Sequence, residues 1–188
     1  TLHIDSVGAL NDAIQSGRAD EIILVPEALH EQGIADTAQQ IAEKNARIIL
    51  IAGPSSSGKT TSSRRLAVQL LARGISPYPL ELDNYFVDRD QTPRDENGDH
   101  DFEALEALNL KRLAVDIEKL VSGEEVQLPR YNFKTGRSED GDVIRLRDGQ
   151  PLILEGIHGL NPRLIPDRWA GSAFRLYVSA LTQLNLDR

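Results

Sequence analysis

The run Gly53-Pro54-Ser55-Ser56-Ser57-Gly58-Lys59-Thr60 constrains the fold of this chain more than any other feature. It matches the pattern G-x-x-x-x-G-K-[ST], in which a loop wraps its backbone N–H groups around a phosphate. Gly53 and Gly58 permit backbone conformations that a side chain would block. Lys59 can neutralise the β- and γ-phosphates, and the Thr60 hydroxyl can bind Mg²⁺. The residues expected to contact ATP are Gly53, Ser55, Ser56, Ser57, Gly58, Lys59, Thr60 and Thr61.

The flanks of this loop decide between a phosphate site and an ordinary serine-rich turn before a helix. The apolar, β-branched run at residues 47–52 is typical of a buried parallel strand. Residues 59–73 have the pattern of a helix, and Gly74 is a favourable residue just after its end. A helix whose N-terminus points at the loop would add its dipole to the anion site, so the context favours phosphate binding.

The rest of the chain alternates predicted strands and helices. A helix is expected at about 104–121, and strands are expected at 75–82, at 174–178 and on both sides of a turn within 143–155. Pro77 and Pro79 restrict the strand at 75–82 to a sheet edge or to a strand start. The alternation favours the α/β class, with a mostly parallel sheet flanked by helices as in the P-loop NTPase fold.

The segment before the loop carries no catalytic pattern. Ile34, Ala38 and Ile41 recur at helical spacing and predict a helix at about 34–45. We therefore divide the chain into a short helical N-terminal appendage, residues 1–46, and a P-loop domain, residues 47–188. The chain starts at Thr1 and contains no Met, so we expect it to be a fragment of a longer protein.

Composition narrows the classes of partner. The formal net charge of −8 argues against a broad electrostatic grip on DNA or on an anionic membrane. Cysteine is absent, so neither disulfides nor thiolate metal sites can form. No apolar run approaches the roughly 18 residues of a membrane span. We expect a cytoplasmic protein with a small-molecule substrate and no membrane or DNA partner, and homo-oligomerisation stays open.

Two acids end apolar runs at positions where a phosphate site needs them. Asp83 follows Leu80-Glu81-Leu82, and Glu155 follows Leu152-Ile153-Leu154. In open α/β sheets, ligands bind at the carboxyl ends of the strands. A kinase uses carboxylates there to orient and deprotonate an acceptor hydroxyl and to hold Mg²⁺. Either acid alone could equally be an ordinary solvated strand end, but beside a P-loop the functional reading is favoured.

Aromatic residues are scarce, yet several lie in polar segments. Tyr85 and Phe86 follow Asp83, Phe102 lies in an acidic stretch, and residues 128–133 contain two more rings. Flat rings suit stacking on a nucleobase, although each ring could equally plug the core under a long loop. Lys134 and Arg137 are weaker candidates for phosphate contacts.

Four motifs in order resemble the uridine kinase and phosphoribulokinase family. They are the P-loop, Leu82-Asp83-Asn84-Tyr85-Phe86, Leu128-Pro129-Arg130-Tyr131-Asn132-Phe133 and Leu154-Glu155-Gly156. The resemblance covers residues 47 to about 182. Within the family, residues 92–98 and 178–185 resemble a bacterial branch in which a threonyl-tRNA-synthetase-like region precedes the kinase. Residues 1–46 would be the end of that region.

The resemblance implies a role for each matching residue. Asp83 matches the acid that activates a nucleoside 5′-hydroxyl, with Lys59 as the catalytic cation. Thr60, Asp83 and Glu155 match the residues around Mg²⁺, and Glu103 falls where uridine–cytidine kinases hold the ribose with an Asp. The positions that match the nucleoside pocket are Phe86, Phe102, Tyr131 and Phe133.

The chain departs from the family pattern at three points. Gly136 falls about where those kinases place a His that reads the pyrimidine edge, and Phe86 replaces a Tyr. The arginine-bearing lid of the family is expected shortly after Arg188. A chain that ends before this lid is expected to bind nucleotide but to catalyse poorly.

The resulting hypothesis is ATP-dependent phosphorylation of a nucleoside 5′-hydroxyl. Two alternatives remain. One keeps the fold and changes the acceptor to another small alcohol, as in phosphoribulokinase or pantothenate kinase. The other is a non-catalytic, nucleotide-binding regulatory module. A GTPase switch is less favoured, because only Asn185-Leu186-Asp187 approaches the guanine signature N-K-x-D.

Overall fold

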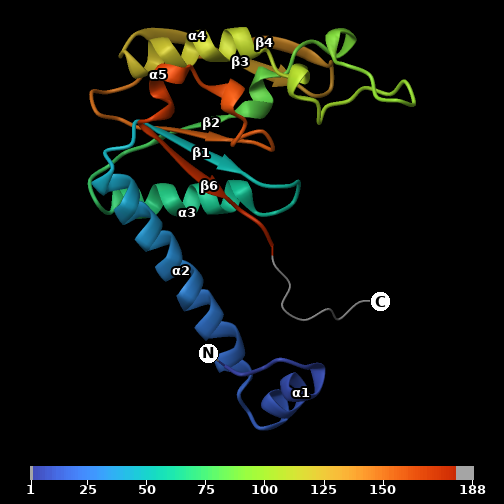
Figure 1. Cartoon of the computed structure of the whole chain (residues 1–188), viewed down its shortest axis with the longest axis vertical. Coiled ribbons are helices and arrows are strands. Elements are labelled where there is room, and N and C mark those ends of the chain that lie inside the picture. Colours follow the sequence, from blue (N-terminus) through green and yellow to red (C-terminus); the bar gives the residue numbers. More distant parts are fainter. Residues whose placement is uncertain (1, 181–188) are drawn as a thin grey trace.

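A four-stranded parallel sheet forms the centre of the computed structural model, which describes residues 2–180 (Figure 1). The strand order is β2-β5-β1-β6, with β1 paired in parallel to both β5 and β6. The bounds are β1 Ile48–Ala52, β2 Tyr78–Glu81, β5 Leu152–Glu155 and β6 Ala173–Tyr177. The predicted α/β class with a mostly parallel sheet is confirmed.

Strand β1 is apolar throughout because it is buried on both faces of the sheet. Ile48 and Leu50 point into one hydrophobic core, and Ile49 and Ile51 point into a second core on the opposite face. Successive side chains of a strand alternate between faces, so a central parallel strand needs apolar residues at every position. The apolar run at residues 47–52 therefore reflects its central place in the sheet.

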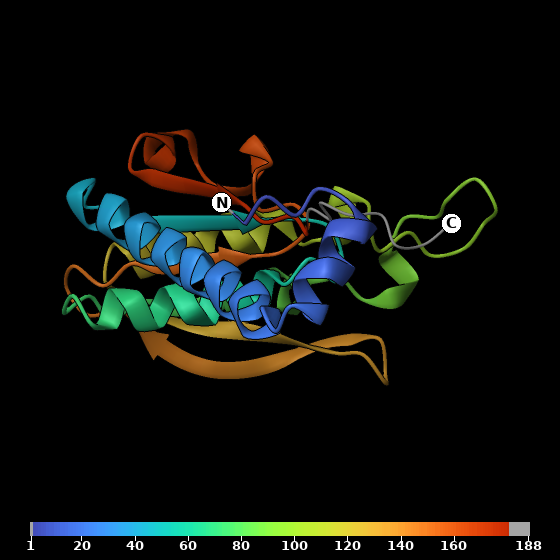
Figure 2. The ribbon, with the colours of Figure 1, turned by 90° about the horizontal axis from the view of Figure 1, so that it is seen from below.

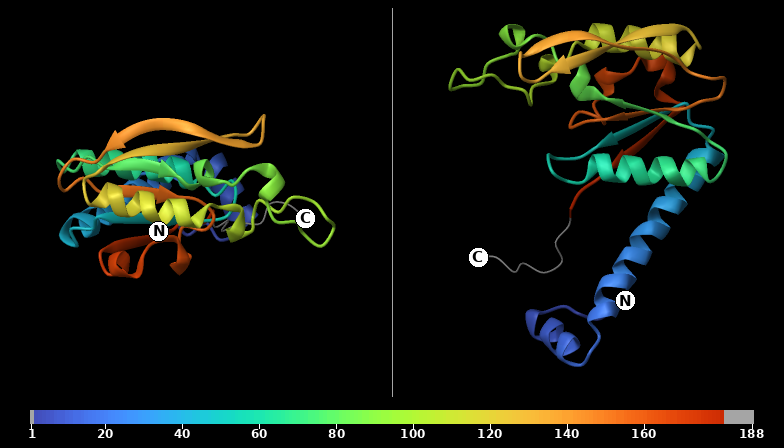
Figure 3. Two further views of the ribbon diagram at one scale, coloured as in Figure 1. Left: turned by 90° about the horizontal axis from the view of Figure 1, so that it is seen from above. Right: turned by 180° about the vertical axis from the view of Figure 1, so that it is seen from behind.

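Helices and a hairpin cover these two faces. Helices α2 (Ala19–Glu43) and α3 (Lys59–Leu71) lie on the face of Ile49 and Ile51, side by side in the view from below (Figure 2). The other face carries α4 (Leu110–Val121) and the antiparallel pair β3 (Glu125–Asn132) and β4 (Arg137–Arg145), seen from above in Figure 3. A short helix, α5, spans Asp167–Ala170.

The N-terminal segment consists of α1 (Val7–Gln15) and the long helix α2. The last turns of α2 pack on the sheet through Ile34, Ala38 and Ile41, which are nearly or fully buried. Its first half projects away from the sheet, toward α1 (Figure 3). None of the helices in residues 2–180 has an apolar stretch of the length that a bilayer span requires.

Several element boundaries differ from the sequence expectation. The helix expected at 34–45 begins fifteen residues earlier, at Ala19, and contains Pro26. The strand expected at 75–82 is limited to Tyr78–Glu81, at the sheet edge where its prolines are tolerated. The helix expected from 104 starts at Leu110, where the Asn109 side chain accepts a hydrogen bond from the Arg112 N–H and caps it.

The hairpin is the largest departure from the expected topology. We expected two strands within 143–155, but the first belongs to β4, which pairs with β3 outside the parallel sheet. The partner β3 was not predicted. The backbone N–H of Ser138 donates to Asp88 Oδ1 at 2.8 Å, which ties the hairpin to the segment after β2. The expectations that concern residues 181–188, including Asn185-Leu186-Asp187, lie outside the described residues.

The packing of α2 predicts unequal costs for two isoleucine truncations on the same helix. Ile41 is 1% exposed and Ile23 is 57% exposed. We expect Ile41→Ala to lower the free energy of unfolding by about 2–4 kcal/mol, because it leaves a cavity between α2 and the sheet. Ile23→Ala, the matched control, should change it by less than about 0.5 kcal/mol. Urea denaturation followed by circular dichroism measures both, and equal costs would contradict the packing.

Candidate functional site

The loop between β1 and α3 needs its two glycines for different reasons. A Cβ on Gly53 would lie 2.1 Å from the Val178 carbonyl oxygen and 2.7 Å from Ser57 Oγ, so no side chain fits there. Gly58 has a φ of +85°, a left-handed conformation at the start of α3, and a Cβ there would meet open space. One glycine permits close packing and the other permits a backbone turn.

Ser56 adopts a left-handed conformation as well, with a φ of +57°. Such values are uncommon for residues other than glycine and cost free energy, so the surrounding loop must hold Ser56 in place. Left-handed residues within a turn can direct successive N–H groups into one concavity, which binds anions. Together with the N-terminus of α3, the loop forms an anion cradle.

Lys59 and Thr60 begin α3, and their side chains form hydrogen bonds to different segments. Lys59 Nζ donates to the Pro54 carbonyl at 2.7 Å, so the ammonium lies across the loop. Thr60 Oγ1 donates to Glu155 Oε1 at 2.7 Å and joins α3 to the end of β5. Among the described residues, 2–180, the buried second carboxylate oxygen of Glu155 has no hydrogen-bond partner, and neither has Ser57 Oγ.

These oxygens fit Mg²⁺ by their chemistry. A buried carboxylate oxygen without a donor is costly unless a cation or ligand completes it. Mg²⁺ prefers oxygen ligands and is usually held by one or two carboxylates together with phosphate and water. Within residues 2–180, no group of three His, Asp or Glu side chains converges, so phosphate and water would have to supply the remaining ligands.

Asp83 lies beside Thr60 and Glu155, on a 3₁₀ turn at Leu82–Tyr85 that follows β2. The pairing of Glu81 with Glu155 brings the ends of β2 and β5 together. Although the Asp83 side chain is exposed, partial desolvation raises its pKa, and the neighbouring Glu81 carboxylate raises it further. Lys59 and His158 oppose this rise in pKa.

His158 is a site residue that the sequence reasoning missed. Its Nε2 is buried and finds no hydrogen-bond partner in the part of the chain that the structure describes, and its proximity lowers the pKa of Asp83. The turn that carries it packs closely on the sheet, since a Cβ on Gly159 would lie 2.3 Å from the Ile51 carbonyl oxygen. Its place three residues after Glu155 is the signal that could have identified it.

Four predicted pocket residues form one aromatic cluster. The ring centroid of Phe86 lies 5.6 Å from that of Phe102 and 5.4 Å from that of Tyr131, and Tyr131 lies 5.0 Å from Phe133. The contacts are edge-to-face, which suits the ring quadrupoles. Phe133 is 59% exposed, so the cluster keeps an open aromatic face. Glu103 is exposed on the loop after Phe102.

Arg89 occupies the space beside Gly136. A Cβ on Gly136 would lie 2.8 Å from the guanidinium carbon, and Arg89 Nη2 donates to the Phe133 carbonyl at 2.8 Å. Sequence reasoning missed Arg89, because its contact with the hairpin tip joins segments more than forty residues apart. An arginine therefore lies where the resemblance led us to look for a histidine.

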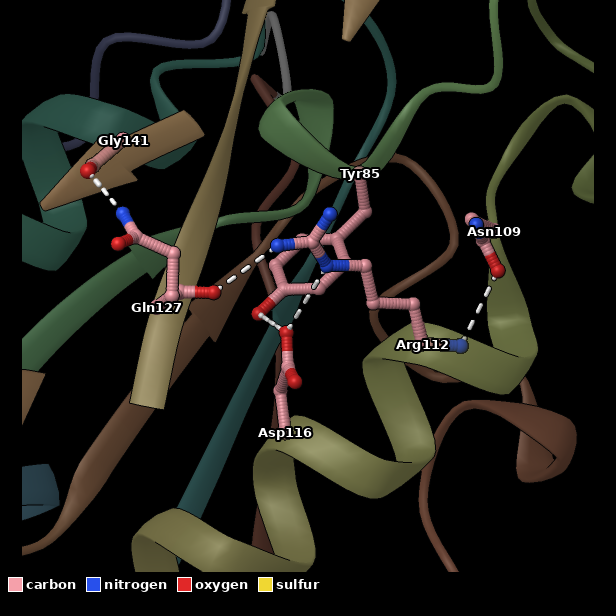
Figure 4. Close-up of polar contacts among 6 residues, drawn as sticks. All are labelled: Tyr85, Asn109, Arg112, Asp116, Gln127 and Gly141. Carbon is pink, nitrogen blue, oxygen red and sulfur yellow. Dashed lines mark hydrogen bonds and ion pairs between the residues drawn. The ribbon is translucent and has the colours of Figure 1, made fainter. Parts of the chain in front are cut away.

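A buried polar network supports the turn that carries Asp83 (Figure 4). Tyr85, at 1% exposure, donates its hydroxyl to Asp116 Oδ2 at 3.1 Å. Arg112 lies 3.6 Å from the same carboxylate and donates to the Gln127 carbonyl at 2.9 Å. Burial raises the pKa of Asp116 despite the opposing effects of Tyr85 and Arg112. The network links the turn, α4 and the hairpin.

A hollow of about 540 Å³ lies at the end of the sheet opposite to the phosphate loop. It is lined by Arg47, Val121 and Arg147, near the amino ends of β1 and β5. Because the phosphate loop follows the carboxyl end of β1, this hollow is separate from the residues described above.

Comparison with known families gives a match to the model of the phosphoribulokinase / uridine kinase family over residues 48–187. A uridine kinase from Halobacterium salinarum is 30% identical over 118 residues, which is 62% of this chain and 50% of the relative. The Arabidopsis thaliana protein named inorganic pyrophosphatase TTM2 is 28% identical over 85% of this chain and 24% of its own length. The chain thus spans half or less of these relatives.

A solved structure agrees with the fold. It is described as a possible uridine kinase from Bacillus stearothermophilus, and it matches with a TM-score of 0.55 at 25% identity. The match covers 70% of each chain.

The raised pKa of Asp116 predicts a pH-dependent effect of its neutralisation. The folded state holds the Asp116 proton more tightly than the unfolded state, so stability falls as pH rises from the ordinary value of 3.8 through the raised pKa. Asp116→Asn keeps an acceptor for Tyr85 and should therefore unfold at a higher temperature than the wild type at neutral pH. The difference should shrink in acid.

Thermal unfolding of both proteins across this pH range measures the effect, and Asp140→Asn, on an exposed carboxylate of β4, controls for the loss of one charge. A less stable Asp116→Asn at neutral pH, or a difference that does not change with pH, would contradict the assignment.

Proposed function

The chain belongs to the phosphoribulokinase / uridine kinase family, and we propose that it catalyses ATP-dependent phosphorylation of a nucleoside 5′-hydroxyl. The observation that carries this proposal is the order of groups along one edge of the sheet. Asp83 follows β2, Glu155 ends β5 and the phosphate loop follows β1, while the strands lie side by side as β2-β5-β1. The groups that we propose as acceptor base, cation site and phosphate cradle are thus neighbours.

Each group has a separate task in phosphoryl transfer. The loop N–H groups and Lys59 hold the β- and γ-phosphates, and Thr60 and Glu155 would hold Mg²⁺, with Asp83 close by. When bound, the ion neutralises charge on the phosphates. Asp83 orients the acceptor hydroxyl and accepts its proton as the oxygen bonds to the γ-phosphorus and the bond to ADP breaks. The raised pKa of Asp83 makes its carboxylate a stronger base than an ordinary aspartate.

The aromatic cluster favours a nucleoside over an aliphatic alcohol. The exposed ring of Phe133 and the partly buried ring of Phe102 offer stacking surface for a base, and the buried rings of Phe86 and Tyr131 support them from the core. Glu103 is proposed to hold the ribose. Arg89, beside Gly136, presents a guanidinium where the hairpin tip meets the cluster. We propose that Arg89 contacts the edge of the base, so that selectivity among bases differs from that of kinases with a histidine there.

The deciding experiment is ADP release from Mg·ATP by the longest available form of the protein. It is screened with uridine, cytidine, purine nucleosides, ribulose 5-phosphate and pantothenate. We expect release that depends on one class of nucleoside. ADP release that depends on another alcohol would identify that alcohol as the acceptor in place of a nucleoside. ADP release without any acceptor would show that water is the nucleophile. ATP binding without turnover would favour a regulatory module.

A carboxylate-to-amide change separates chemistry from binding. Asp83→Asn should retain ATP affinity while turnover falls by about 10²–10⁴-fold, the contribution of a positioned general base. Lys59→Ala is the matched comparison, because it should weaken ATP binding itself through the loss of the loop cation. Isothermal titration and steady-state kinetics give both quantities. Wild-type turnover in Asp83→Asn would remove Asp83 from the mechanism.

A further inference from the structure

A groove of about 340 Å³ opens beside the phosphate loop, between α2, α3 and the end of β6. Leu29, His30 and Gly33 of α2 form one wall, Ser62 and Leu66 of α3 form the second, and Val178 lies at the third side. Ser62 is in the first turn of α3, where its N–H donates to the Gly58 carbonyl at 2.8 Å. The groove therefore borders the helical turn that begins at the phosphate loop.

The order of strands determines which ligand can reach this groove. The sheet runs β2-β5-β1-β6, so the groove at β6 and Asp83 at β2 lie on opposite sides of the loop. With strands about 4.8 Å apart, three spacings separate these two ends by roughly 14 Å. In phosphoryl transfer the attacking and leaving oxygens are roughly in line. An acceptor at Asp83 therefore requires the rest of the donor to extend toward β6.

The chemistry of the groove suits a planar group with a polar edge. Leu29, Leu66 and Val178 supply apolar surface, whereas His30, Thr37 and Ser62 supply groups that hydrogen-bond. Thr37 Oγ1 donates to the Gly33 carbonyl at 2.8 Å, which leaves its oxygen free to accept. The volume is in the range of small-molecule sites, which are mostly apolar with a few placed polar groups.

We propose that this groove binds the nucleobase and ribose of the phosphate donor, and that α2 selects the donor base. The proposal rests on the proposed function, because it takes Asp83 as the acceptor side. The α2 wall precedes the family match, which starts at residue 48, so this selectivity comes from a segment outside the family domain. Inorganic tripolyphosphate, which has no base, should bind the loop without using the groove.

Gly33 allows a test that leaves the phosphate loop intact. A Cβ at Gly33 meets nothing within 4 Å, so a larger side chain enters the groove without a clash. Leucine and alanine both favour helix over glycine, so Gly33→Leu and Gly33→Ala should fold. We expect Gly33→Leu to weaken ATP binding about tenfold or more and to leave tripolyphosphate binding unchanged. Gly33→Ala, which fills little of the groove, should retain most of the ATP affinity.

Calorimetric titration of wild type and both variants with Mg·ATP, Mg·GTP and tripolyphosphate separates the outcomes. Loss confined to the nucleotides supports the groove as the base site. Equal affinities in wild type and Gly33→Leu would overturn it, as would an equal loss for tripolyphosphate, which would indicate a disturbed loop. Binding of none of the three ligands by the wild type would refute the proposed function and the groove assignment with it.

Discussion

The parallel pairing of β1 with β5 is the constraint on which the site depends. It sets Ile51 beside Glu155, so a carboxylate lies at the strand end from which the phosphate loop departs. The Thr60 hydroxyl then closes the gap with a 2.7 Å hydrogen bond across 95 residues of sequence. Without this register, the first turn of α3 would lie beside no carboxylate of β5.

The same register concentrates negative charge at one edge. Glu81 pairs with Glu155, and Asp83 follows two residues later. Partial burial raises the pKa of Asp83, and the neighbouring Glu81 carboxylate raises it further. Lys59 and His158 oppose this rise in pKa.

Local signals made part of this structure predictable from sequence. The glycines and lysine of the loop, and the apolar run of a strand buried on both faces, act within a few residues of each other and identified the phosphate loop and its strand. The family resemblance came from the order of four such short motifs along the chain. The hairpin was not predictable in the same way. Val126, Leu128 and Tyr131 are buried, but Pro129 and a register irregularity interrupt their alternation.

Contacts between side chains far apart in the sequence could not be predicted from the sequence either. Arg89 and Gly136 meet only because the hairpin folds over the segment that follows β2. Helix α4 begins only at Leu110 because the backbone before it pairs with the segment after β2, through an antiparallel bridge between Phe86 and Leu108. The N-cap at Asn109 forms where this pairing ends. These features depend on which segments become neighbours, and one-dimensional patterns do not carry that information.

The hydrophobic core extends beyond the family match, because residues of α2 before residue 48 belong to it. Ile34, Ala38 and Ile41 share a core with Ile49 and Leu66, on either side of residue 48. Since close-packed interiors transmit strain, the position of α2 is coupled to α3 and so to the loop at its start. Its first half is exposed at Ile23 and Leu24 and lacks this support. The groove wall therefore stands at the junction between a half of α2 that is anchored in the core and a half that is exposed.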